Sequence, residues 1–138
     1  MPRFLIYALI LILPGSAFAQ QTSFFPTYDD YEAYVDAQIM SRDYIPLVVQ
    51  LGGGDEITKE QLENFKRQLD FLYVRDFENV KILKSVTLES GFEQEARAYW
   101  SGLTGYLFYY ALLHRRDDGI VVLEFVLNST AKSIMDRF

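Results

Sequence analysis

The second half of the chain contains three long extended segments joined by glycine-containing turns, and this feature constrains the fold most. The segments are residues 92–101, 103–114 and 120–128, all rich in aromatic and β-branched residues. Gly102 and Gly105 mark the first turn, and Asp118-Gly119, a dipeptide favoured in two-residue hairpin turns, marks the second. Residues 79–89 alternate apolar and polar side chains before them. The sequence therefore predicts a four-stranded antiparallel meander.

Helical periodicity precedes the meander at two places. Thr27, with Asp30 three residues later, predicts the start of a first helix, which should end before Pro46. Thr58, with Gln61 three residues later, predicts the start of a second. The two apolar stripes are Tyr28, Tyr31, Val35 and Ile39, then Leu62, Phe65, Leu69 and Leu72. A short C-terminal helix over residues 129–138 completes the prediction.

The alternation of side chains along a strand predicts which residues share a face. If Arg97 pairs with Tyr109, one face is nearly all apolar, and we expect the helices to pack on it. This face collects Phe92, Gln94, Ala96, Ala98, Trp100, Tyr106, Phe108, Tyr110, Leu112, His114, Val121, Leu123, Phe125 and Leu127. A ligand pocket at its open end would be lined by Gln94, Trp100, Tyr106, Phe108, Tyr110 and His114.

The opposite face mixes charged and apolar side chains, which suits a protein interface better than plain solvent exposure. We expect a homodimer across it, with Glu95, Arg97, Tyr109 and Glu124 as interface residues. The alternative is a lone domain in which the terminal helix or the N-terminal segment covers this face.

The N-terminus has the pattern of a secretory signal peptide. Arg3 precedes an apolar run over residues 4–13, and small residues before Gln20 suit cleavage after Ala19. The run is about half the ~20 residues needed to span a bilayer, so we expect no stable membrane anchor after cleavage. Residues 1–19 are thus a predicted signal peptide and 20–138 a single α+β domain, exported to a bacterial periplasm or to the extracellular space.

Composition excludes several chemistries. The chain has no cysteine and one histidine, so disulfides, thiolate metal sites and cysteine nucleophiles are impossible and His-rich metal sites are excluded. We predict no metal and no cofactor. The formal net charge of −6 opposes binding to phosphate backbones and anionic lipid surfaces, so nucleic acid is not an expected partner.

Two helices followed by the long strands over residues 92–101, 103–114 and 120–128 resemble the nuclear-transport-factor-two-like superfamily, which includes polyketide-cyclase-like proteins. The resemblance is one of architecture and implies a strongly curved, cone-like sheet with a pocket at its open end. The cystatin-like fold is the nearest competitor. Catalytic members of the superfamily place an aspartate, alone or with a histidine, inside the cone. The candidate acids from the helices are Asp36 and Asp70.

These observations favour an exported, non-catalytic domain that binds a small hydrophobic or amphipathic ligand, or a protein partner. One alternative is a cofactor-free isomerase, dehydratase or hydrolase that uses His114 with a buried acid. Another is a structural accessory subunit that dimerises through the sheet. His114 has a simpler interpretation too, as a strand-end residue that bonds to a turn.

Overall fold

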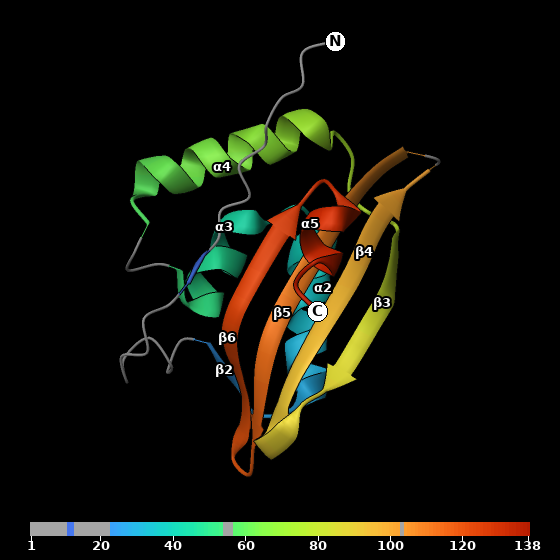
Figure 1. The fold of residues 1–138 in the computed structure, drawn as a ribbon. Coiled ribbons are helices and arrows are strands. Elements are labelled where there is room, and N and C mark those ends of the chain that lie inside the picture. The colour runs from blue at the N-terminus through green and yellow to red at the C-terminus, as the bar shows by residue number, and fades with distance from the viewer. Residues whose placement is uncertain (1–10, 13–22, 54–56, 103) are drawn as a thin grey trace.

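The computed structural model describes residues 11–12, 23–53, 57–102 and 104–138. Its four long strands form an open antiparallel meander, in the order β6-β5-β4-β3 (Figure 1). They are β3 (Asn79–Thr87), β4 (Phe92–Ser101), β5 (Thr104–Arg116) and β6 (Gly119–Asn128). Two short strands, β1 (Leu11–Ile12) and β2 (Phe24–Phe25), both pair with β6. The predicted α+β class and antiparallel meander are confirmed.

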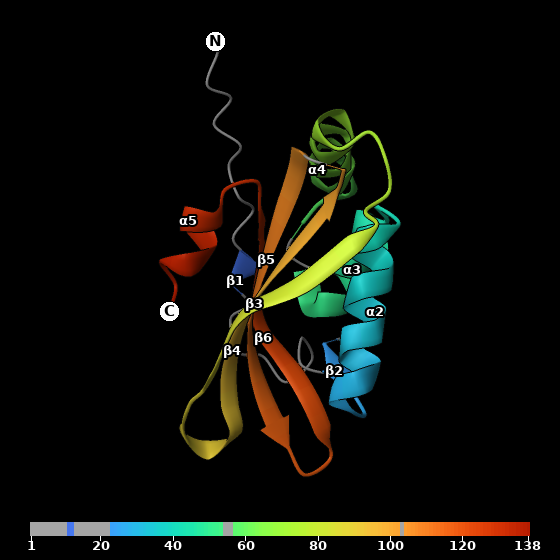
Figure 2. The same cartoon turned by 90° about the vertical axis from the view of Figure 1, so that its right-hand side faces the viewer.

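Helices lie on both faces of the sheet and at one end (Figures 1 and 2). They are α2 (Tyr28–Met40), α3 (Tyr44–Val48), which continues into a π-helical turn (Val49–Gly53), α4 (Lys59–Leu72) and α5 (Ala131–Met135). In Figure 2 the sheet separates α2 and α3 from α5. We call the side with α2 the inner face and the side with α5 the outer face.

Both predicted helix starts are confirmed by their caps. The Thr27 hydroxyl accepts from the amide of Asp30 at 3.1 Å, and Thr58 forms a full capping box with Gln61. These contacts satisfy amides that have no partner within the first helical turn. Pro46 lies in the first turn of α3, where the missing amide costs nothing. The segment around it is therefore a helix of its own.

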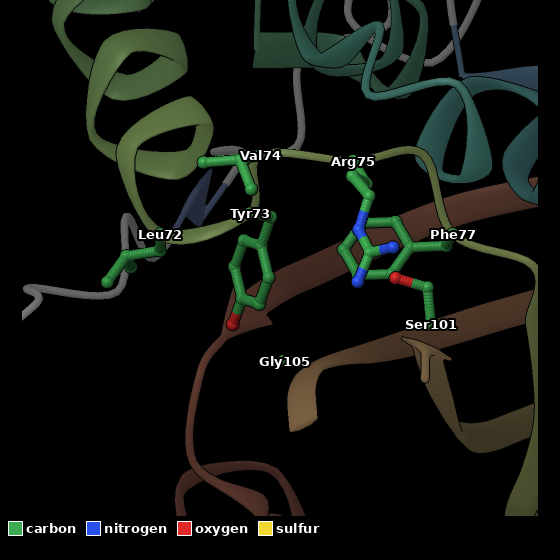
Figure 3. Close-up of a pocket in the computed structure, with 7 residues that line it drawn as sticks. All are labelled: Leu72, Tyr73, Val74, Arg75, Phe77, Ser101 and Gly105. Carbon is green, nitrogen blue, oxygen red and sulfur yellow. The ribbon is translucent and has the colours of Figure 1, made fainter. Parts of the chain in front are cut away.

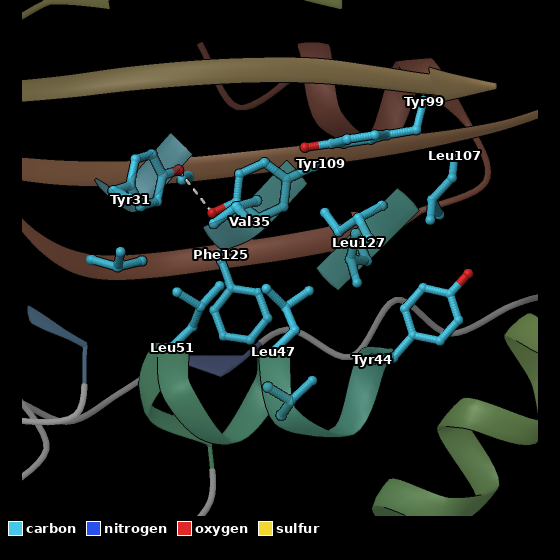
Figure 4. Packing of buried hydrophobic residues seen from close by; sticks show 14 of the residues in the cluster. Tyr31, Val35, Tyr44, Leu47, Leu51, Tyr99, Leu107, Tyr109, Phe125 and Leu127 are labelled. Carbon is cyan, nitrogen blue, oxygen red and sulfur yellow. Dashed lines mark hydrogen bonds between the residues drawn. The ribbon is translucent and has the colours of Figure 1, made fainter. Parts of the chain in front are cut away.

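The main core lies between the inner face and the helices (Figure 4). Tyr31 and Val35 of α2 and Leu47 of α3 pack towards Tyr109 and Phe125 of the sheet. All five side chains are buried. Removing this much apolar surface from water supplies the main stabilisation of the fold.

The predicted face assignment is wrong for β4 and β5, although the strand pairing behind it is right. Arg97 pairs with Tyr109 as expected, and the near-parallel rings of Trp100, Tyr106 and Phe108 show that these side chains share a face. The long helices, however, pack on the opposite face. It can be buried because its apolar residues are large and because α2 supplies partners for its charges. Among the described residues, α5 and the C-terminal Phe138 pack on the other face.

A β-bulge in β6 changes the pattern further. Leu112 pairs with Glu124 and Leu113 with Val122, which leaves Leu123 as an extra residue. Val122 and Phe125 consequently both join the inner core, although simple alternation would place them on opposite faces. Glu124 turns to the outer face, away from Glu95 and Arg97, with which it was expected to share an interface.

Candidate ligand-binding site

Arg97 is the centre of a polar cluster between α2 and β4. Its guanidinium lies 2.7 Å from a carboxylate oxygen of Glu32, 3.2 Å from one of Glu95 and 3.3 Å from one of Asp36. It also donates to the hydroxyl of Tyr28 at 2.7 Å. Because one buried cation meets three carboxylates, this cluster fixes α2 to the sheet by charge as well as by packing.

Tyrosine hydroxyls complete the cluster. Glu95 accepts from Tyr28 at 2.7 Å and from Tyr31, whose hydroxyl also lies 2.9 Å from that of Tyr109 (Figure 4). Tyr99 donates to Asp36 at 2.6 Å. The buried carboxylate oxygens of Glu95 thus have donors around them, as buried charge requires.

Local sequence positions these groups. Tyr28, Glu32 and Asp36 recur every four residues, which places them on one side of α2, beside the apolar stripe that faces the core. On β4, Glu95 and Arg97 alternate with Ala96 and therefore point to the inner face. Glu32 was not among the candidate residues expected from the sequence. The signal that could have found it is the acidic stripe of α2 together with Arg97, the one basic residue of β4.

Burial changes the protonation of the cluster. Burial raises the pKa of Asp36 above its ordinary value, although the hydrogen bond from Tyr99 and the charge of Arg97 oppose the shift. Burial alone would lower the pKa of Arg97, but Glu95 and Glu32 outweigh it and raise the pKa. Burial also raises the pKa of Tyr31, so its hydroxyl stays protonated. Burial therefore favours the protonated form of Asp36 more than it would be favoured in an exposed aspartate.

A cavity of about 360 Å³ adjoins the cluster. This α2–β3 cavity is lined by Glu32, Asp36, Val80, Lys81, Ile82 and Arg97. The side chain of Glu32 is 36% exposed and that of Asp36 22%, whereas that of Arg97 is 2% exposed. The volume of the α2–β3 cavity falls in the range of roughly 300–1,000 Å³ that is typical of ligand pockets. It combines an apolar strand wall with two reachable carboxylates.

The predicted pocket residues lie on the outer face and do not line this cavity. Gln94 donates to the hydroxyl of Tyr110 at 3.0 Å and to the carbonyl of Arg137 at 2.9 Å. Tyr110 packs edge-on against Phe138, so α5 and its tail cover this part of the face. The remaining aromatic candidates are Trp100, Tyr106 and Phe108, which form a near-parallel row of rings. The structure thus brings these three together and separates them from the helix-covered face.

In the part of the chain that the structure describes, no hydrogen bond or ion pair joins His114 to an acid. Its Nε2 lies 3.0 Å from the carbonyl of Ser90, and its ring stacks on Phe92 at 4.1 Å. It points to the outer face, whereas Asp36 lies on the inner side of the sheet. Asp70 pairs with Lys66 at 2.9 Å. The histidine and the helix acids are therefore not assembled into one site.

The predicted interface residues are divided between the two faces. Glu95, Arg97 and Tyr109 are buried beneath α2 of the same chain. Glu124 pairs with Arg137 at 2.6 Å on the outer face. Because α2 occupies the mixed face, three of the four predicted interface residues are covered within the chain itself. The homodimer stays a prediction.

A second, smaller cavity of about 90 Å³ lies where the end of α4 meets the β4–β5 turn (Figure 3). It is lined by Leu72, Tyr73, Val74, Arg75, Phe77, Ser101 and Gly105. The Tyr73 hydroxyl donates to the carbonyl of Tyr106 at 2.7 Å and ties the two segments together.

No family model matches the chain, and neither a curated protein nor a solved structure is detectably similar to it. Within the part of the chain that the structure describes, no helix is both long and apolar enough to cross a membrane. The same residues contain no group of three or more histidine and acidic side chains suited to hold a metal ion. The geometry of the cluster and of the α2–β3 cavity is therefore the basis for assigning a function.

Proposed function

We propose that this protein is an exported, non-catalytic domain that binds a small amphipathic ligand in the α2–β3 cavity. The observation that carries the proposal is the cavity itself, with an apolar wall of Val80 and Ile82 opposite the carboxylates of Glu32 and Asp36. Ligand sites typically combine an apolar lining with a few polar groups that fix orientation.

The polar wall favours an amphipathic ligand over a purely hydrophobic one. An apolar molecule in this cavity would strip water from Glu32 and Asp36 and offer no hydrogen bond in return, which is costly. A ligand that places a polar group on these carboxylates and apolar carbon on Ile82 avoids that cost. This refines the ligand class expected from the sequence.

We also propose the fold family and the cellular location that the sequence predicts. An open antiparallel meander preceded by helices supports the resemblance to nuclear-transport-factor-two-like proteins and their cone-like curvature. The hydrophobic run and small residues before Gln20 support export.

A cofactor-free enzyme is the second candidate. Its acid would be Asp36, which acts without the His114 that was expected beside it. The observation that favours it is the raised pKa of a carboxyl group that lines a cavity and bonds to Tyr99. Asp36→Asn distinguishes the two functions: an isomerase, dehydratase or hydrolase would retain its ligand but lose turnover, whereas a binding domain has no turnover to lose.

Native mass spectrometry of protein purified from its own host tests the binding function. We expect a retained small molecule that Ile82→Trp, which fills the cavity, displaces. Leu83→Trp is the matched control, because Leu83 is an exposed neighbour outside the cavity lining. Retention of the same molecule by both variants, with folding intact, would place the ligand elsewhere and refute the proposed site.

A further inference from the structure

Large apolar side chains that line the smaller cavity, or that follow or precede its lining residues in the sequence, are strongly exposed. Phe71 is 79% exposed, Val74 74%, Tyr106 45% and Leu72 40%. We call Phe71, Leu72, Val74, Arg75 and Tyr106 the hairpin-end patch. Large apolar side chains exposed together in this way are typical of protein docking sites.

The cavity within the patch has the size of a single side chain. Its volume of about 90 Å³ is well below the roughly 300 Å³ at which drug-sized ligand pockets begin. In Figure 3 Leu72, Tyr73 and Val74 lie on one side of it, and Arg75, Phe77 and Ser101 on the other. A small pocket with an apolar rim is the usual receptor for one anchoring residue of a protein partner.

The charges beside the patch indicate the chemistry of that partner. Arg75 is exposed, and its Nη2 would lie 4.0 Å from a Cβ placed on Gly102, so the guanidinium stands over the β4–β5 turn. Arg67 lies one helical turn before Phe71. Among the described residues, neither arginine forms an ion pair with a carboxylate, whereas the nearby Asp70 and Asp76 already pair with Arg42. Two unpaired cations therefore border an apolar surface on a chain of net charge −6.

We propose that the hairpin-end patch docks a protein segment that inserts one apolar side chain into this cavity and places carboxylates on Arg75 and Arg67. The apolar rim supplies affinity, and the arginines select the acidic flanks of the segment. This site is separate from the α2–β3 cavity, so a protein partner and a small ligand can bind independently.

Selection of short peptides from a random display library on the full protein tests this inference. We expect enrichment of sequences with one aliphatic or aromatic residue flanked by Asp or Glu. An enriched peptide should bind Arg75→Glu and Val74→Asp at least about tenfold more weakly, as expected when one anchoring contact is lost. Arg116→Glu and Leu83→Asp are controls at exposed positions outside the patch, and there the affinity should change by less than about twofold.

Charge exchange makes the test specific to Arg75. A peptide with lysines in place of its acids should bind the wild type poorly and Arg75→Glu better. Unchanged melting temperatures exclude unfolding as the cause. The inference fails if basic peptides are enriched, if acidic peptides bind all variants equally, or if sedimentation shows a dimer that Val74→Asp dissociates, because the occupant is then a second copy of the chain.

Discussion

At the scale of single residues, the ion pairs of Arg97 allow the charged face of the sheet to be buried. Charged residues are rarely buried unless they are paired, so the face that carries Arg97 was predicted to form a dimer interface or to be covered by the terminal helix or the N-terminal segment. Several members of the polar cluster were singled out from the sequence. They are Asp36, as a helix acid, and Glu95, Arg97 and Tyr109, on the mixed face. It does not show that they meet, because the pairing joins residues of α2 and β4 that lie more than sixty positions apart.

Replacing Arg97 by Met should destabilise the protein strongly. The substitution leaves Glu95 buried without its cation, and breaking a buried pair in this way costs about 3–5 kcal/mol. Arg116→Met is the matched control, since Arg116 pairs with Asp118 at the exposed β5–β6 turn, and such pairs contribute about 0–1 kcal/mol. Urea unfolding measures both changes. Equal, small losses for the two variants would show that Arg97 is not buried as described.

The raised pKa of Asp36 gives a pH dependence with a defined sign. The folded protein takes up this proton at a higher pH than the unfolded chain, whose value is near 3.8. The contribution of Asp36 to the free energy of unfolding is therefore complete below 3.8 and is lost as the pH rises through the folded pKa.

Comparison with Asp36→Asn isolates this contribution. The free energy of unfolding of the wild type, minus that of the variant, should increase as the pH is lowered from neutrality towards 3.8. Denaturant titrations at several pH values measure it. A difference that stays constant or falls on acidification would contradict the assigned environment of Asp36.

At the scale of elements, the sequence predicts those features that depend on residues close to one another in the chain. The threonine caps and the pairing of Arg97 with Tyr109 follow from short stretches of sequence, and the structure confirms them. The second hairpin turn was predicted at Asp118-Gly119 but lies one residue earlier, at Asp117-Asp118, because Arg116 pairs with Gly119. The bulge at Leu123 could not be predicted from the sequence. The strand is apolar whether or not it contains the bulge, and only packing against the helices selects the bulged register. The same holds for the choice of face, which depends on contacts made by α2 and α5.

Docking of α5 on the outer face should contribute measurably to stability. Ile134 is fully buried against Ala96, Tyr110 and Val126. Ile134→Ala should therefore lower the free energy of unfolding by about 2–5 kcal/mol, as expected for a buried aliphatic residue. Lys132→Ala, on the exposed side of the same helix, should change it by less than about 0.5 kcal/mol. An equally small effect for Ile134 would show that α5 is not docked.

At the scale of the whole molecule, one sheet carries an ion-paired inner face under α2 and an aromatic outer face that α5 covers in part. This arrangement places the larger cavity beside the ion cluster and the smaller one at the β4–β5 turn. The predicted signal peptide lies mostly outside the described residues and includes β1. Cleavage after Ala19 would remove β1 and leave β6 to pair with β5 and β2.

Export itself can be tested on the mature protein. Intact mass and N-terminal sequencing of protein from its own host should show a chain that begins at Gln20 and lacks residues 1–19. Recovery of the full-length chain would contradict cleavage and retain β1.

Hydroxyl-radical footprinting with residue-level mass spectrometry tests the orientation of the sheet most directly, because adjacent aromatic residues point to opposite faces. Trp100 and Tyr106, on the outer face, should be oxidised readily in the native protein, while Tyr99 and Tyr109, beneath α2, should stay protected until it unfolds. Protection of Trp100 and Tyr106 together with rapid oxidation of Tyr99 and Tyr109 would contradict the buried ion cluster and the cavity beside it.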